Sequence, residues 1–156
     1  MFELLIVISA FLGMEFVAWA THKYVMHGIC WFLHEDHHVL TGKPYQKNDS
    51  FALVFAIPSI TCFFVGSFYE PTWLIYIGMG ILLYGIAYML VHDIFIHRRL
   101  KIFQKPKNKY LKGILYAHRI HHSNLGKENC EYFLSLIHIS EPTRPRLISY
   151  AVFCLK

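Results

Sequence analysis

The sequence predicts an all-α membrane protein with three to four transmembrane helices and a cytosolic helical cap that carries histidines. Composition is the first reason, since 55% of the residues are hydrophobic and only 16% are charged, a balance typical of membrane proteins. The second reason is that the apolar residues gather in three runs, each long enough to cross a bilayer. The third is that ten of the eleven histidines follow two of these runs.

The three apolar runs are residues 2–21, 51–69 and 73–91. The first is about 20 residues long, the length that a helix needs to cross the hydrocarbon core. In the third run, Gly78 and Gly85 lie seven residues apart and so share one helical face. Small residues in that arrangement predict close packing against a neighbouring helix. We therefore expect three transmembrane helices from these runs.

The charged residues predict the orientation of these helices. Runs two and three form a hairpin through the turn at residues 70–72, so the segments after run one and after run three emerge on the same side. That side carries twelve basic residues up to residue 133, which are Lys23, Lys43, Lys47, Arg98, Arg99, Lys101, Lys105, Lys107, Lys109, Lys112, Arg119 and Lys127. The opposite side carries only Glu3 and Glu70. The positive-inside rule therefore makes the histidine side cytoplasmic.

The histidines form two sets of five, each made of an H-x4-H pair followed by an H-x2-H-H triplet. The first set is His22, His27, His34, His37 and His38, and the second is His92, His97, His118, His121 and His122. Only His138 stands outside them. A single H-x2-H-H could arise by chance or form a surface patch. Two copies, each preceded by H-x4-H and both on one side of the membrane, predict shared metal ligation.

The two spacings place the imidazoles differently. The histidines of H-x2-H-H lie at i, i+3 and i+4, so they share one face of a helix, and two such helices could hold a pair of metals. The spacing of H-x4-H separates the rings by about 140° on an ideal helix. Each H-x4-H pair must therefore reach the site through a frayed helix end, a π-bulge or two adjacent metals. Gly28, just after His27, is a plausible helix stop and favours fraying.

The ligand type narrows the choice of metal. Imidazole suits Zn, Cu, Fe and Ni alike. Ten nitrogen ligands exceed one coordination sphere and fit two metals, so a lone structural zinc is disfavoured. Zinc performs no redox chemistry, whereas two irons with open positions could activate O2 beside the bilayer, where an apolar substrate would arrive. A dinuclear iron site is therefore one candidate, and the other metals that imidazole binds stay open at this point.

Several other residues are candidates for the same site. The carboxylates of Asp36 and Asp93, next to the histidines, could orient the imidazole rings by hydrogen bonds; solvated surface charge is the alternative. Glu15 lies within the first apolar run, where an ionisable residue is a functional candidate, although it could simply be protonated and packed. Tyr84 and Tyr88 could line an apolar substrate pocket, or serve only in helix packing.

The basic residues do not require a nucleic-acid partner. The net charge is +5, but lysines and arginines beside membrane spans follow from the positive-inside rule. The basic segment 105–112 is expected to contact anionic lipid headgroups, and docking of an acidic electron-donor protein is the alternative. The four cysteines show no paired spacing, which argues against a disulfide framework.

Four segments resemble the β-carotene hydroxylases of the fatty-acid hydroxylase superfamily, the non-haem di-iron membrane oxygenases. They are HKYVMHG at residues 22–28, HEDHH at 34–38, VHDIFIHRR at 91–99 and AHRIHHSNLGKE at 117–128. The resemblance covers residues 13–133. It implies that the ten histidines of the two sets ligate two irons, with O2 as co-substrate and a ferredoxin-type electron donor. The implied reaction is hydroxylation of β-carotene from the bilayer at C3 of each β-ionone ring, giving zeaxanthin through β-cryptoxanthin.

The resemblance also divides the chain. Residues 1–133 are expected to form a single membrane hydroxylase domain. Residues 134–156 form an atypical tail that resembles translated sequencing adapter, so we hypothesise that this tail is non-native or a truncated end. The family is usually described with four transmembrane helices, so a short or re-entrant segment is expected beside the three runs.

Two other functions stay open. The same metal chemistry serves hydroxylases and desaturases of fatty acids, sterols and sphingolipids. A histidine-rich metal transporter or sensor is the more distant alternative, because a transporter is expected to place its ligands near the membrane midplane. The histidines here cluster just beyond the apolar runs.

Overall fold

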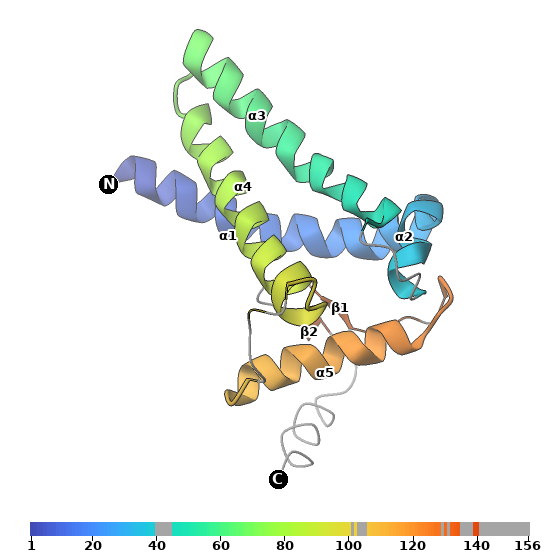
Figure 1. The fold of residues 1–156 in the computed structure, drawn as a ribbon. Coiled ribbons are helices and arrows are strands. Elements are labelled where there is room, and N and C mark those ends of the chain that lie inside the picture. The colour runs from blue at the N-terminus through green and yellow to red at the C-terminus, as the bar shows by residue number, and fades with distance from the viewer. Residues whose placement is uncertain are drawn as a thin grey trace.

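The computed structural model contains three long apolar helical segments, which include α1, α3 and α4 (Figure 1). The histidines lie at the ends of the first and third segments and in the elements that follow them. The structure describes residues 1–39, 45–100, 102, 106–128, 130, 132–134 and 139–140. Most of the tail predicted at residues 134–156, with His138, lies outside the described residues.

The described elements are helical apart from one short pair of strands. The helices are α1 (Phe2–Ala20), η1 (Thr21–Ile29), α2 (Trp31–His38), η2 (Lys47–Phe51), α3 (Ala52–Phe68), α4 (Leu74–Tyr88), η3 (Met89–Ile96) and α5 (Lys109–Ser123). Of these, η1 and η3 are π-helical and η2 is a 3-10 helix. The antiparallel strands are β1 (Phe133–Leu134) and β2 (Ile139–Ser140). The predicted all-α class is confirmed.

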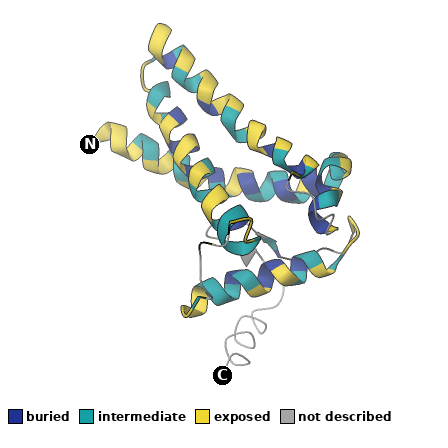
Figure 2. Ribbon diagram, viewed as in Figure 1, coloured by how far each residue is buried: buried dark blue, intermediate teal, exposed yellow. Residues whose placement is uncertain are grey.

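Three continuous helical segments are long and apolar enough to cross a membrane, by length and composition. They are Phe2–Ile29, Lys47–Phe68 and Leu74–Ile96, with mean hydropathy of 2.0 to 2.1. Only 11% to 17% of each apolar window is buried, so most of these side chains face outward (Figure 2). Apolar surface of this extent is stable against lipid rather than water. The prediction of three spans is confirmed, and the first and third continue as helix into their histidines.

Small residues allow the spans to approach closely. A Cβ added to Gly78 would lie 3.0 Å from the backbone oxygen of Ser59, whose hydroxyl donates to the Gly78 carbonyl oxygen over 2.9 Å. On Gly80, a Cβ would lie 2.6 Å from the backbone oxygen of Val7, so the crossing of α1 and α4 requires glycine there. Gly85 differs from the prediction. A Cβ there would meet nothing within 4 Å, because Gly85 borders a cavity instead of a helix.

Helix α5 lies across the histidine-bearing ends of the spans, far from the turn between α3 and α4 (Figure 1). Asn108 caps its start by accepting hydrogen bonds from two backbone N–H groups of the first turn, which stabilises a helix N-terminus. The buried residues of α5 are Ile114, Ala117, His118 and His121. They follow the spacing of one helical face, so α5 buries two imidazoles along its inner stripe.

Candidate metal centre

All ten histidines of the two predicted sets converge at the end of the spans. Eight of them form two groups, within each of which the candidate ligand atoms lie within 4.8 Å of one another. The first nitrogen group is His22, His27, His34 and His121, and the second nitrogen group is His37, His97, His118 and His122. The other two adjoin them. His38 Nε2 lies 3.3 Å from His34 Nε2, and His92 Nε2 lies 3.3 Å from His37 Nε2.

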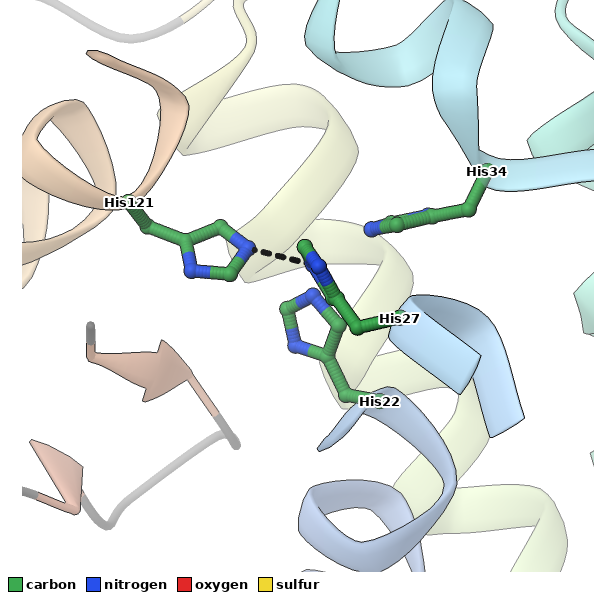
Figure 3. A group of neighbouring side chains, drawn as sticks. All are labelled: His22, His27, His34 and His121. Carbon is green, nitrogen blue, oxygen red and sulfur yellow. Dashed lines mark hydrogen bonds between the residues drawn. The ribbon is translucent and has the colours of Figure 1, made fainter. Parts of the chain in front are cut away.

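Each nitrogen group takes three histidines from one set in the sequence and one from the other. In the first group His121 of α5 points toward the rings from η1 and α2, and its Nε2 lies 3.0 Å from His27 Nε2 (Figure 3). In the second group His37 of α2 joins three histidines of the later set, among which His97 Nε2 and His118 Nε2 are 2.7 Å apart. This exchange ties α2 and α5 to both groups.

The H-x4-H pairs reach the groups through π-helical turns, one of the three routes that the spacing allowed. In a π-helix, each N–H donates to the carbonyl five residues earlier, so residues five apart lie about one turn apart. The His97 N–H donates in this way to the His92 carbonyl over 3.0 Å. Fraying at Gly28 is not the route. Gly28 leaves helical geometry (φ −107°, ψ −114°), but Cys30 N–H still donates to the Val25 carbonyl over 2.8 Å.

Side-chain amides orient two of the rings. His34 Nδ1 donates to Asn48 Oδ1 over 2.6 Å, and His37 Nδ1 donates to Gln46 Oε1 over 2.9 Å. Neither amide was predicted as a site residue from the sequence. The sequence pattern that could have identified this segment is Q-x-x-D directly before an apolar run, which is typical of a helix start. In the structure, Gln46 and Asp49 form a capping box at the start of η2.

Two more rings are held at Nδ1 by other oxygens. His38 Nδ1 lies 3.0 Å from the backbone oxygen of Asn124, and His92 Nδ1 lies 3.2 Å from Asp93 Oδ1. A proton on Nδ1 leaves the Nε2 lone pair free. Hydrogen bonds of this kind fix the tautomer and orientation of metal-binding histidines, and it is the Nε2 atoms that converge.

The remaining candidates from the sequence lie farther from the rings. Asp36 accepts hydrogen bonds from the backbone N–H groups of Lys47, over 2.6 Å, and of Asn48, over 3.4 Å. It therefore supports the segment that carries the amides. Glu15 accepts a hydrogen bond from the Tyr84 hydroxyl over 2.9 Å, which joins α1 to α4.

Burial keeps the imidazoles outside the spans neutral. It lowers the pKa of His34 to about 2 and that of His37 to about 3. The pKa values of His97, His118 and His122 also lie far below the ordinary value. Burial is the largest cause, and repulsion from neighbouring imidazoles is the second. Neutral imidazole is the form that binds metals. The buried Nε2 of His122 also has no hydrogen-bond partner among the described residues, which suits an atom that would ligate an ion.

The spacing of the nitrogens fits a shared ion. Two imidazole nitrogens at ~2.1 Å from one metal and ~90–110° apart lie about 3.0–3.4 Å apart. Three of the Nε2–Nε2 contacts, at 3.0 to 3.3 Å, lie in this range, and the contact between His97 and His118 is shorter, at 2.7 Å. Groups made only of imidazole suit transition metals, whereas Mg²⁺ and Ca²⁺ prefer oxygen ligands. The residues therefore fit a pair of transition-metal ions.

An apolar cavity of about 660 Å³ ends on the histidine cluster. Residues of α1, α3 and α4 form its walls, and His22, His34 and His92 lie among its lining residues. Its volume falls within the range of small-molecule sites. Of the two tyrosines proposed for a pocket, Tyr88 lines this cavity, whereas Tyr84 is fully buried in the core cluster with Met14 and Ala18 of α1. The fold and the site define an integral membrane protein with buried histidine clusters that face an apolar cavity.

The chain belongs to the fatty acid hydroxylase family, whose sequence model matches residues 7–139. It is 42% identical over 130 residues to the beta-carotene hydroxylase of Pseudescherichia vulneris, covering 83% of this chain and 73% of that one. The beta-carotene hydroxylase of a Paracoccus species is 34% identical over 134 residues, covering 85% and 82%. The chloroplastic beta-carotene hydroxylase 2 of Capsicum annuum is 37% identical over 119 residues, covering 74% and 39%. No solved structure matches the chain. The resemblance predicted from the four motifs is confirmed.

Proposed function

We propose that this protein is a membrane di-iron monooxygenase that hydroxylates C3 of the β-ionone rings of carotenoids, converting β-carotene to zeaxanthin through β-cryptoxanthin. The observation that carries the proposal is the apolar cavity that ends on His22, His34 and His92. The names of the bacterial and plant relatives, all beta-carotene hydroxylases, support a carotenoid substrate.

The ten histidines of the two sets would hold two irons. When bound, the iron pair supplies the redox chemistry that activates O2. Each hydroxylation consumes one O2, two electrons and two protons, and it yields the ring alcohol and one water. The chain itself supplies neutral imidazoles, and it supplies hydrogen-bond acceptors at Nδ1 that keep the Nε2 lone pairs directed inward.

The cavity binds and shields the ring. Apolar walls, including Phe55, Ile81 and Leu82, bind an apolar ring through burial of its surface. They also exclude water from the reacting carbon, which protects the chemistry from side reactions. Because α3 and α4 expose apolar side chains around this cavity, a carotenoid would arrive from the bilayer.

The electrons would come from an acidic ferredoxin-type protein on the cytoplasmic side, where the histidines lie. Basic residues concentrate on this side of the spans. A basic surface accelerates encounter with an acidic partner. The same residues would contact anionic lipid headgroups between encounters.

Residues 1–133 would form the working domain, with the tail at 134–156 dispensable. The pairing of β1 with β2 makes residues 134–140 the part of the tail to test. Truncation after residue 140 should leave hydroxylation unchanged, whereas truncation after residue 133 would show whether the strand pair contributes. Loss of activity after truncation at residue 133 would contradict the proposed domain boundary.

The test of function is expression in a bacterium that accumulates β-carotene, followed by pigment chromatography. Zeaxanthin and β-cryptoxanthin should appear with the natural chain and be absent with His118→Ala. Unchanged β-carotene, in cells whose purified protein contains iron, would contradict the carotenoid substrate. Analysis of fatty acids, sterols and sphingolipids in the same cells then tests the alternative substrates.

A further inference from the structure

The guanidinium of Arg99 connects two segments that flank the histidine cluster. Arg99 follows η3, and its Nη2 donates to Asp49 Oδ1 and, over 3.1 Å, to Gln46 Oε1 at the start of η2. Its Nε lies 3.8 Å from Asp93 Oδ1. The side chain is only 30% exposed, so this network is partly shielded from solvent screening. Arg99 was counted in the sequence only as one of many basic residues.

Two of these oxygens also hold imidazoles. Gln46 Oε1 accepts from His37 Nδ1 over 2.9 Å, and Asp93 Oδ1 lies 3.2 Å from His92 Nδ1. His37 Nε2 and His92 Nε2 then lie 3.3 Å apart. The contacts therefore close a ring from Arg99 through Gln46, His37, His92 and Asp93 back to Arg99.

We propose that Arg99 is a positioning residue for the second nitrogen group. It orders His37 of that group, and the adjoining His92, by fixing the two oxygens that orient these rings. This inference rests on the metal centre under the proposed function. Arg99 acts through Gln46 and Asp93, not on the ions themselves. The effect should fall on the second group, because Asn48, which orients His34 of the first group, donates its backbone N–H to Asp36 and has no hydrogen bond to Arg99 in the described structure.

The chemistry of the side chains explains why arginine suits this role. A glutamine amide can present either its oxygen or its NH2. A guanidinium against Gln46 Oε1 fixes the oxygen toward His37, so that Nδ1 of His37 carries the proton and Nε2 stays free. Arginine presents five donors on a rigid planar fork and can serve two acceptors at once, whereas lysine is a single point charge. Asp49 adds to this order, since its Oδ2 accepts the Gln46 backbone N–H over 3.1 Å.

A purely structural ion pair makes a different prediction. If Arg99 only joined η3 to η2, its loss would lower the melting temperature or disturb both nitrogen groups alike. If Arg99 positions ligands, its loss should weaken the binding of one ion and leave the binding of the other unchanged. The adjacent Arg98 provides a matched control, because it carries the same charge at the same end of η3 and has no hydrogen bond or ion pair in the described structure.

The test is an anaerobic titration of the full-length, metal-free protein in detergent with Fe(II), with bound iron per chain measured by mass spectrometry. The natural chain and Arg98→Gln should bind two ions. Arg99→Gln should keep one ion at natural affinity and bind the second about 10–100-fold more weakly, the usual effect of losing a partner that orients a ligand. The affinity of Arg99→Lys for the second ion should fall between that of the natural chain and that of Arg99→Gln. Visible spectra after Co(II) substitution should change at one ion only.

The outcomes separate the two proposals. Two ions bound at natural affinity by Arg99→Gln, or equal weakening of both, would overturn the positioning role and leave the proposed function intact. Fewer than two ions in the natural chain would refute the di-iron centre itself, and the positioning role with it. If Arg99→Gln fails to fold, Arg99→Lys and Gln46→Ala provide the same comparison, and selective loss of one ion in them supports the proposal.

Discussion

The two nitrogen groups are built from equivalent sequence repeats but lie in different surroundings. All four histidines of the first group are buried, whereas His97 and His122 of the second are partly exposed. The first group contributes His22 and His34 to the lining of the apolar cavity, whereas the second contributes none of its four histidines. The second group is instead oriented by the polar network around Arg99, part of which also lines the cavity. A repeated ligand pattern therefore does not imply a symmetric centre. The difference fits a site that meets its apolar substrate at the first group and the aqueous side at the second.

The largest loss of hydroxylation is expected when an imidazole of the metal centre is removed. Replacing any one of six histidines with Ala should abolish hydroxylation, while the protein still inserts; these are His34, His37, His38, His118, His121 and His122. We expect a loss beyond the ~100-fold that follows removal of partners that merely orient ligands. Pigment chromatography in cells, with membrane fractionation as the insertion control, measures it. Turnover retained in several of these variants would argue against ligation.

The orienting amides should affect the two groups separately. Asn48→Ala should weaken the ion at the first group, and Gln46→Ala the ion at the second, each by about 10–100-fold. In a stepwise Fe(II) titration, each variant should retain one ion at natural affinity, and the visible spectra after Co(II) substitution should show that the two variants weaken different ions. Ser50→Ala, whose hydroxyl donates only to the Lys47 backbone oxygen in the described hydrogen bonds, is the control. Equal weakening of both ions by either variant would show that the groups are not independent.

Filling the cavity should slow turnover without disturbing the metals. Ala56 lines the cavity on α3, and Ala56→Trp should lower kcat/KM for β-carotene about tenfold or more, since pocket shape discriminates strongly against misfit. Iron content should not change. Leu53→Trp, on the exposed face of the same helix, should have little effect. Equal activity in both variants would mean that the cavity does not receive the substrate.

The smallest effects are expected from glycine substitutions on α4, and they should change the stability of the fold. Gly80→Ala places a Cβ 2.6 Å from the Val7 backbone oxygen, and overpacking of this kind costs about 1–3 kcal/mol of stability. Gly85→Ala enters open space and should stabilise the helix by about 0.5–1 kcal/mol, the usual gain over glycine. Denaturant unfolding in detergent micelles compares the two. A Gly80→Ala variant as stable as Gly85→Ala would contradict the close crossing of α1 and α4.

The spans and the histidine sets could be predicted because both are local patterns, apolar length in one case and ligand spacing in the other. The pairing of the sets in space could not. The transfer of His121 to the first group and of His37 to the second depends on how α2 and α5 face each other, which no local spacing encodes. Gly28 favoured fraying, but continued hydrogen bonding gave a π-helix. The amides of Gln46 and Asn48 gain their roles only once η2 places them beside the rings.

The most direct test of the account is the iron content and Mössbauer spectrum of the natural chain, loaded anaerobically with ⁵⁷Fe(II). Two nitrogen groups in different surroundings predict two irons per chain with two distinct quadrupole doublets. One iron per chain would contradict the claim that the two histidine sets build a dinuclear centre.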